Sequence, residues 1–399
     1  MSKKAGLPVS GQPTVKISRR GAERLRDGHV WVYRSDVASA EAVAPGGLVQ
    51  VKDDRGKFLG SALYSSSSQI AIRMLSAEPV SDLAGLLRER VGAAIAYRER
   101  VVRDTDAYRV IFSEADFLPG LIADRYNDVL SLQILTQAMD SDLARTAVIS
   151  ALQREWKLSA IAERVDPRVR ELENLAPRES SLLQGEKSAT VVSMNGVRFH
   201  YDALQGQKTG SFLDQRENYA AAAQYAQGKA LDVFCYQGGF ALHLAPHCDA
   251  VTGVDSSRPA LEVAEQNAAL NGREIEWIEG NAFDLLKDYA SGGRQYDTIV
   301  IDPPAFAKTK KNVETALRGY KELNLRALKM LRPGGLLVTC SCSYHVSEGE
   351  FAGVVAQAGQ DAHRQLRILE RRGQAKDHPV LLSVPETSYL KCLIVYVSY

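Results

Sequence analysis

The stretch KALDVFCYQGGFALHL, residues 229–244, decides the fold of the C-terminal half of the chain. Residues 229–234 are expected to form an apolar strand, and the glycine pair Gly238-Gly239 opens a helix. The same alternation continues along residues 191–399, with strands expected at 250–254, 275–278, 298–301 and 336–338 and a long amphipathic helix at 314–331. Alternation at this spacing is typical of a doubly wound parallel sheet, which binds ligands at the carboxyl ends of its strands.

Two smaller domains are expected before this sheet. Residues 1–78 carry a pattern typical of a small β-barrel, with short strands expected at 15–17, 30–33, 48–51, 58–64 and 70–75. Residues 79–190 indicate an α+β domain, with helices expected at 83–103 and 140–158 and strands at 108–112, 129–135 and 160–165. Residues 171–187 are polar and lack periodicity, so we expect an exposed connection there. The third domain then spans residues 191–399.

The composition is that of a chain able to bury large cores. Its 399 residues are 45% hydrophobic and 24% charged, which excludes a disordered or fibrous protein. Its five cysteines are an odd number and none are spaced as CxxC, so we expect neither a disulfide framework nor a metal site. The start of the chain lacks the apolar segment of a secretory signal, and no run reaches membrane-spanning length. We therefore expect a cytoplasmic protein.

Polar residues follow four of the expected strands, at Asp232, Asp255, Asn281 and Asp302. The loop after Asp232 differs from a GxGxxG motif, because a carboxylate there would repel a pyrophosphate. It suits a cofactor with a cationic end and no phosphates, such as S-adenosylmethionine (SAM). Asp255 could accept both ribose hydroxyls, and Asn281 could read an adenine edge. Each residue alone is more often a helix cap or turn residue, but four in register favour a SAM site.

Two cysteines lie in the segment TCSCS, residues 339–343, which follows the fifth expected strand. Strand periodicity places Cys340 and Cys342 on the same face. Cys340 lies nearer the apolar interior, where a cysteine is usually a small hydrophobe. Cys342 lies toward the loop rim, where a substrate would be, and it is the better candidate nucleophile.

A thiol at this place fits methylation of carbon 5 of a pyrimidine, an atom too weakly nucleophilic to attack a methyl sulfonium directly. A thiolate that adds to carbon 6 pushes electron density onto carbon 5. Asp302 could hold N3 during the addition. Enzymes that methylate an exocyclic amine typically place an aromatic directly after the two prolines, where this chain has Ala305. The base must be unstacked to react, and Phe306 or Tyr320 could stack on it.

The chain carries KTGSFLDQR at 208–216, the Gly238-Gly239 loop, DPPAF at 302–306, RGYK at 318–321 and SCS at 341–343. Together these motifs resemble the bacterial large-subunit (23S) ribosomal RNA cytosine-5 methyltransferases. The segments RL at 24–25 and GHVWVY at 28–33 resemble the start of that family's N-terminal PUA domain. FLPGLIADRY at 117–126 resembles its central α+β module.

The resemblance implies a class I, Rossmann-like methyltransferase domain that binds SAM, an RNA-binding PUA domain, and a homodimer. It implies Cys342 as the nucleophile and a SAM pocket lined by Lys208, Phe212, Asp232, Phe234, Gly238, Gly239, Asp255, Asn281 and Asp302. The residues expected to bind RNA are Phe306, Lys308, Arg318, Tyr320, Arg19, Arg20 and Arg24. RNA cytosine-5 methyltransferases with two cysteines carry the second at the position of Ala305, so here one cysteine must suffice, as it does in the branch that this chain resembles.

Three other functions are compatible with parts of this pattern. Methylation of the amino group or a ring nitrogen of guanine would keep the fold and leave Cys342 without a catalytic role. A non-catalytic RNA-binding adaptor is disfavoured, because Asp232, Asp255, Asp302 and Cys342 are all present. A DNA methyltransferase is disfavoured because the N-terminal domain resembles one that reads RNA.

The net charge of +1 conceals two basic segments. Residues 1–34 and 306–332 each hold eight Lys or Arg against two acids, so each carries +6 and the rest of the chain carries −11. The first segment falls on the expected RNA-binding domain, and the second directly follows Asp302-Pro303-Pro304. This distribution predicts an RNA partner, with binding that salt weakens.

Overall fold

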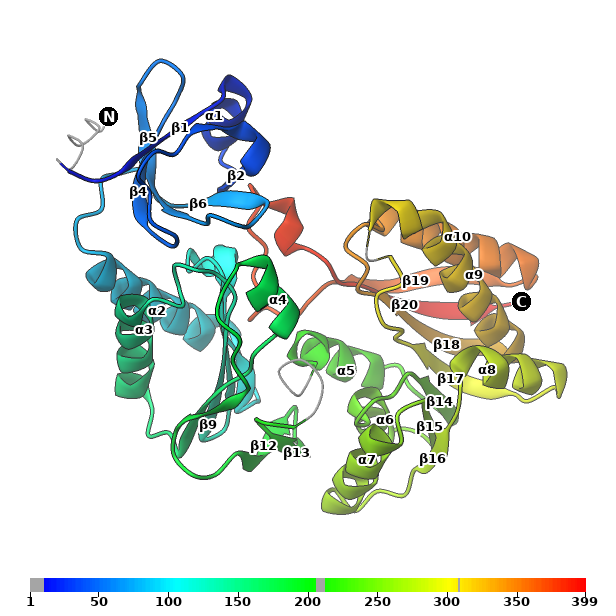
Figure 1. The fold of residues 1–399 in the computed structure, drawn as a ribbon. Helices are drawn as coiled ribbons and strands as arrows, with labels where there is room; N and C mark the ends of the chain where they lie inside the picture. Colours follow the sequence, from blue (N-terminus) through cyan, green and yellow to red (C-terminus); the bar gives the residue numbers. More distant parts are fainter. Residues whose placement is uncertain (1–10, 206–211, 308) are drawn as a thin grey trace.

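The computed structural model describes residues 11–205, 212–307 and 309–399 (Figure 1). Its strands form an N-terminal sheet, a central sheet, a two-stranded hairpin and a C-terminal sheet. No helix among the described residues is long and apolar enough to cross a membrane. Nor do the described His, Cys, Asp and Glu side chains form a cluster that could hold a metal ion.

The N-terminal sheet has six strands in the order β2-β6-β5-β4-β1-β3. All five strands expected from the sequence are confirmed, while β3 and helix α1 were not expected. The side chain of Ser18 caps α1 by accepting from the Gly21 N–H at 3.2 Å, and Gly21 and Ala22 are buried. The elements are β1 (Thr14–Ile17), α1 (Arg19–Arg26), β2 (Trp31–Tyr33), β3 (Val37–Ser39), β4 (Leu48–Lys52), β5 (Phe58–Tyr64) and β6 (Ile70–Ser76).

The central sheet has five strands in the order β11-β10-β9-β8-β7, and its helices pack on it through one apolar cluster. Residues 171–187 are mostly exposed, as expected, but they are not a simple connection, because they contain the end of α4 and the edge strand β11. Three of the four residues of β11 are exposed, so the strand has no apolar face to detect. The elements are α2 (Leu83–Val101), β7 (Ala107–Phe112), β8 (Leu121–Tyr126), β9 (Val129–Ile134), α3 (Asp142–Glu155), β10 (Ala160–Glu163), α4 (Pro167–Leu172) and β11 (Ser181–Gln184).

A hairpin of β12 (Ala189–Met194) and β13 (Val197–Asp202) joins the central and C-terminal sheets. On one side, Tyr201 stacks on Tyr126 with ring centroids 3.5 Å apart. On the other, the His200 N–H donates to Asn267 Oδ1 at 2.8 Å. The domain boundary proposed at residues 190/191 thus lies inside β12, and the three-domain division stays a proposal.

The C-terminal sheet has seven strands in the order β16-β15-β14-β17-β18-β20-β19. The first five are parallel, as expected, but β20 runs antiparallel to both of its neighbours. Helices α8, α9 and α10 pack on one face, and α5 and α6 on the other. The elements are α5 (Arg216–Ala223), β14 (Lys229–Val233), α6 (Gly239–Leu244), β15 (Ala250–Asp255), α7 (Arg258–Leu270), β16 (Glu276–Glu279), α8 (Ala282–Ser291), β17 (Tyr296–Ile301), α9 (Val313–Met330), β18 (Leu331–Ser341), α10 (Glu348–Asp361), β19 (Gln365–Arg372) and β20 (Lys391–Ser398).

A long connection between β19 and β20, residues 373–390, reaches the other two parts of the molecule (red in Figure 1). We call it the strap. Its Asp377 accepts two hydrogen bonds from the Arg216 guanidinium at 2.9 and 3.0 Å, and one from the Arg109 N–H at 2.8 Å. The carbonyl of Asp377 accepts from Arg98 at 2.7 Å. The strap therefore connects α5 to the central sheet through one buried carboxylate.

The Arg216–Asp377 ion pair lies almost wholly out of water, with side chains 1% and 0% exposed. Burial alone would raise the pKa of the Asp377 carboxyl, but His378 and Arg216 lower it well below its usual range. A carboxyl whose folded-state pKa is depressed stabilises the fold above its unfolded pKa and loses that contribution as the pH falls.

Replacing Asp377 with Asn should lower the free energy of unfolding at neutral pH by about 3–5 kcal/mol, because the buried Arg216 charge would keep only the more distant carboxylate of Glu217, at 3.8 Å. Thermal or urea unfolding would measure the loss. The matched control is Glu314→Gln, which removes an exposed ion pair with Arg318 and should change little. Equal stability of the two variants would contradict the role given to the buried pair.

Candidate functional site

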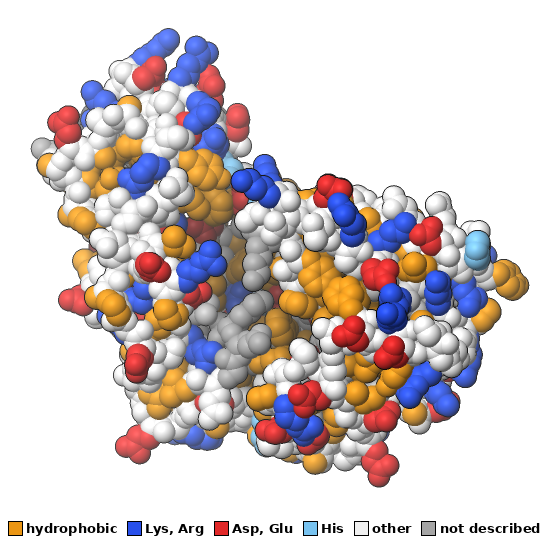
Figure 2. All heavy atoms as spheres, turned by 45° about the vertical axis from the view of Figure 1, so that its right-hand side comes forward, with side chains coloured by type: hydrophobic (Ala, Val, Ile, Leu, Met, Phe, Trp, Pro, Cys, Tyr) orange, Lys and Arg blue, Asp and Glu red, His pale blue; other side chains and the backbone are white. Residues whose placement is uncertain are grey.

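The carboxyl ends of β14, β15, β17 and β18 meet at one edge of the C-terminal sheet. This edge lies next to a hollow between the part of the molecule that holds the N-terminal and central sheets and the part that holds the C-terminal sheet, which we call the two lobes (Figure 2). Asp232 lies near the end of β14, opposite Gly253 of β15 and Val300 of β17. Asp255 ends β15, and Asp302 directly follows β17. The sheet therefore brings the three predicted aspartates to one place.

Asp232 is fully buried, and only one of its two carboxylate oxygens accepts a hydrogen bond from a described residue. Oδ2 accepts from the Ala241 N–H at 2.8 Å, whereas Oδ1 has no hydrogen-bond partner among the described residues. Burial raises the pKa of Asp232 to about 8, and the charges of Asp302 and Asp255 add to the rise. A buried anion among other anions is costly unless a cation neutralises it. This arrangement fits the cationic end of SAM.

The glycine pair after β14 is explained by packing. A Cβ on Gly239 would lie 2.5 Å from the ring of Tyr219, and one on Gly238 would lie 2.8 Å from Trp277. Gly238 also has a φ of +86°, which favours glycine. These contacts require both glycines whether or not a ligand is bound.

The loop between β14 and α6 is held in an uncommon backbone conformation. Phe234 and Tyr236 have φ values of +69° and +48°, in the left-handed region that side chains seldom occupy. Asp255 braces this loop, because its Oδ2 accepts from the Tyr236 N–H at 2.9 Å. Its Oδ1 accepts from the Ser257 N–H, also at 2.9 Å. Such strain often accompanies a site whose shape matters.

The remaining residues expected in the SAM pocket differ in how well the structure supports their expected role. Asn281 caps α8, since its Oδ1 accepts from the N–H groups of Phe283 and Asp284 at 2.9 and 3.4 Å. Phe212 lies edge-on to the Tyr236 ring, with centroids 5.1 Å apart. Lys208 lies outside the described residues.

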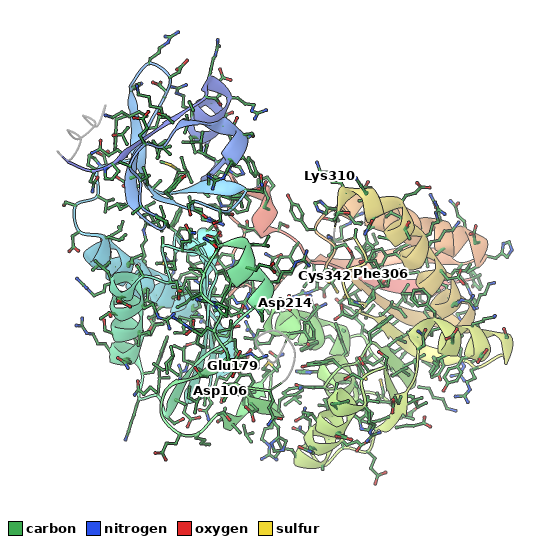
Figure 3. All side chains as sticks on the ribbon, in the orientation of Figure 1. Asp106, Glu179, Asp214, Phe306, Lys310 and Cys342 are labelled. Atoms are coloured by element: carbon green, nitrogen blue, oxygen red, sulfur yellow. The ribbon has the colours of Figure 1, made fainter. Side chains whose placement is uncertain are left out.

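The two candidate cysteines occupy different environments. Cys340 is fully buried on β18 opposite Cys392 of β20, and burial raises the pKa of its thiol well above the ordinary value. Cys342 lies just past the end of β18 and is only partly buried. Its Sγ is 3.8 Å from the carbonyl oxygen of Pro303, in the loop that follows Asp302. Figure 3 shows Cys342 facing the space between the lobes, near Phe306.

Tyr320 corrects one expectation, because it is fully buried and cannot stack on a base. Its hydroxyl lies 2.9 Å from both Ser341 Oγ and Ser343 Oγ, on either side of Cys342. Ser343 Oγ also accepts from the Ala307 N–H at 3.1 Å. The ring packs against half-buried Phe306 at 4.9 Å. Tyr320 therefore clamps the Cys342 segment to the loop after Asp302.

Of the thirteen basic residues of the two segments that the structure describes, eight already have acidic partners. Arg20 and Arg24 both bind the buried carboxylate of Asp36, so their expected role in RNA binding loses support. Similar pairs join Arg19 to Glu23, Arg26 to Asp53, Arg318 to Glu314, Lys321 to Asp361, Arg326 to Glu322 and Arg332 to Asp297.

Three exposed lysines of the second segment are not paired in this way among the described residues: Lys329 near the end of α9, and Lys310 and Lys311 before its start. Lys310 and Lys311 make no ion pair within the part of the chain that the structure describes. They lie on the short turn before α9, and Lys310 stands at the rim above Cys342 (Figure 3). Lys308 lies outside the described residues.

The sequence pattern did not reveal three residues near the site, Lys391, Tyr389 and Asp214. Their contacts join segments that are far apart in the sequence. Lys391, the first residue of β20, donates to the Ser343 carbonyl at 2.7 Å. Tyr389 of the strap donates to Asp214 Oδ2 at 2.6 Å. Asp214 belongs to the KTGSFLDQR motif, but nothing in that motif indicates its partner.

Comparisons with known proteins agree with this arrangement. Two family models match: a PUA-like domain over residues 15–77 and an S-adenosylmethionine-dependent methyltransferase over residues 171–393. Ribosomal RNA large subunit methyltransferase I of Photobacterium profundum is 38% identical over 391 residues, which cover 95% of this chain and 98% of that protein. The protein of the same name from Shewanella denitrificans is 38% identical over 390 residues, 94% and 98% of the two chains.

Two solved structures have the same fold. A methyltransferase complexed with SAH superposes with a TM-score of 0.83 at 20% identity, over 96% of this chain and 100% of that one. A SAM-dependent methyltransferase from Streptococcus mutans gives a TM-score of 0.81 at 19% identity, with the same coverage. Together the matches confirm the predicted fold class and SAM as the cofactor.

The pKa of Asp232 predicts how SAM binding depends on pH. Because Asp232 is mostly protonated at neutral pH and a cation favours its charged form, binding should release a proton. Affinity should then rise with pH up to about 8, by at most about tenfold per pH unit, and level off above it. Calorimetry in buffers of different ionisation enthalpy would count the protons. Asp232→Asn should bind SAM more weakly and without this pH dependence, and an unchanged pH dependence in that variant would contradict the assignment.

Proposed function

This chain belongs to the ribosomal RNA large subunit methyltransferase I family, and from that premise we propose that it methylates carbon 5 of a cytosine in 23S ribosomal RNA. The observation that carries the proposal is the position of Cys342. Its partly buried thiol lies beside the loop that follows Asp302, at the strand ends where Asp232 is buried and its Oδ1 has no hydrogen-bond partner among the described residues. A second feature is Ala305, which stands where enzymes that methylate exocyclic amines typically carry an aromatic.

The proposed reaction begins with the thiolate of Cys342. Its sulfur forms a bond to carbon 6 of cytosine, and the electrons of the double bond move to carbon 5 and the N3 side of the ring. Asp302 holds N3 during this step. When bound, SAM supplies the methyl group that carbon 5 takes. A base then removes the proton on carbon 5, and those electrons restore the double bond as the thiolate leaves.

The residues around the thiol serve to position it. Tyr320 holds the serines on both sides of Cys342, so the sulfur keeps its place relative to the loop after Asp302. Phe306, half-buried over Tyr320, is the aromatic that could stack on an unstacked base. We keep Lys208, Phe212, Phe234, Asp255 and Asn281 as proposed residues of the SAM pocket.

The assembly and location of the protein belong to the same proposal. The N-terminal domain would bind the RNA, the family resemblance implies a homodimer, and the sequence pattern predicts a cytoplasmic protein. Whether naked RNA or an assembled subunit is the substrate is an outcome of the assay below.

The direct test gives the purified protein labelled SAM with 23S ribosomal RNA, naked and in large subunits, and identifies the methylated nucleoside. We expect 5-methylcytidine at one position, because the thiol activates carbon 5. Cys342→Ala should abolish the product, whereas Cys340→Ala should retain it. A methylguanosine product would favour the guanine alternative, and the opposite mutant pattern would show that the nucleophile is misassigned. A protein that binds RNA but not SAM would revive the adaptor alternative.

A second test concerns the unpaired lysines before α9. Replacing Lys310 and Lys311 together with Gln should weaken RNA binding and lower the slope of log affinity against log salt by about one to two, since two phosphate contacts would be lost. Fluorescence anisotropy at several salt concentrations would measure both. The control is Arg318→Gln, whose side chain is already paired with Glu314 and should matter less. Equal effects of the two changes would argue against a specific role for the lysines.

A further inference from the structure

Lys391 is a buried cation next to the segment that carries Cys342. It pairs with Ser341 in the register of β18 and β20, and it is only 9% exposed. Its Nζ donates to the carbonyls of Ser343 and Tyr389 at 2.7 and 2.8 Å. The ammonium is therefore fixed beside the residue that directly follows Cys342.

The charge of Lys391 has no carboxylate partner in an ion pair among the described residues. Glu348 and Glu350 of α10 act on it electrostatically, but both are engaged elsewhere. Glu350 Oε2 accepts from the N–H and hydroxyl of Ser347 at 2.8 and 2.6 Å, and Glu348 Oε1 accepts from Arg371 at 3.0 Å. A buried ammonium held only by carbonyl oxygens is costly, and a nearby anion would offset that cost.

Cys342 is the group on the β18 side whose charge acts on Lys391. The other titratable groups that the Cys342 charge affects are Tyr320 of α9 and Tyr389 of the strap. Burial raises the pKa of both phenols, so both are neutral at physiological pH, and neither supplies a positive charge. Asp302, on the neighbouring strand end, would itself disfavour a thiolate. Lys391 is the positively charged group that the geometry places here, since its Nζ is held at the carbonyl of the residue after Cys342.

We propose that Lys391 is a positioning residue that holds Cys342 as its thiolate. The Lys391 ammonium keeps its proton, and its positive charge stabilises the negative charge that Sγ carries once its own proton has passed to water. Burial lowers the pKa of Lys391 to about 8, so the side chain is still mostly an ammonium at neutral pH and can offset the charge of a thiolate. Its importance for catalysis rests on the proposed function, but the thiolate can be measured without RNA.

The test follows the alkylation of Cys342 by iodoacetamide from acid to alkaline pH, with mass spectrometry to distinguish it from the other four cysteines. In Lys391→Met, alkylation of Cys342 at neutral pH should slow by about tenfold or more, and the midpoint of the pH profile should rise by about one pH unit or more. Lys391→Arg, which keeps a cation, should retain most of the wild-type profile. The control is Lys287→Met, on the exposed face of α8, which should leave the profile unchanged.

An unshifted midpoint in Lys391→Met would overturn the proposal. If thermal unfolding shows that this variant does not fold, Lys391→Arg decides: a retained low midpoint supports the role, and a midpoint as high as that of free cysteine overturns it. The two proposals can fail separately. Absence of 5-methylcytidine from the wild-type assay would leave the alkylation result standing, whereas normal synthesis with an unshifted alkylation profile would reject only the role of Lys391.

Discussion

The buried ion pair between Arg216 and Asp377 holds together the parts from which the site is built. Arg216 begins α5, whose Tyr219 occupies the space that Gly239 leaves open beside the Asp232 loop. Asp377 fixes the strap, and the strap leads directly to Tyr389 and Lys391. This one ion pair therefore fixes how the loop between β14 and α6, the cysteine segment at residues 339–343 and the central sheet lie relative to one another. Because both partners are out of water, an arrangement that separated them would leave each buried charge without its main partner, which is costly.

The cluster of aspartates at the end of the sheet could be predicted from the sequence, because it depends only on where each aspartate lies along its own strand. In a parallel sheet, a residue at the end of one strand lies beside the ends of its neighbours, so Asp232, Asp255 and Asp302 must meet. The cysteine segment follows the same logic, since distance from the strand interior separates Cys340 from Cys342. What the pattern alone did not reveal is that Asp232 keeps an unpaired buried oxygen, which depends on how α6 approaches the strand.

Other parts of the site depend on contacts that no local pattern records. Tyr320 lies on an amphipathic helix in a basic segment, where an exposed aromatic that binds RNA was a reasonable interpretation. Its burial follows from how α9 packs on the sheet and from the two serines beside Cys342. The basic segments misled in part for the same reason, because several of their acidic partners, such as Asp36 and Asp361, lie on other elements. Lys391 enters from a strand far along the chain.

The position of β20 has a consequence for the order in which the protein can assemble. Strands β18 and β19 are both synthesised before β20, yet β20 lies between them and pairs with each. Until β20 emerges from the ribosome, the nascent sheet stops at β18 and exposes an unpaired edge next to the cysteine segment. Insertion of β20 closes that edge and delivers Lys391 in the same event. The sheet therefore loses its open edge and the cysteine segment gains its buried lysine in one step, once β20 has been synthesised.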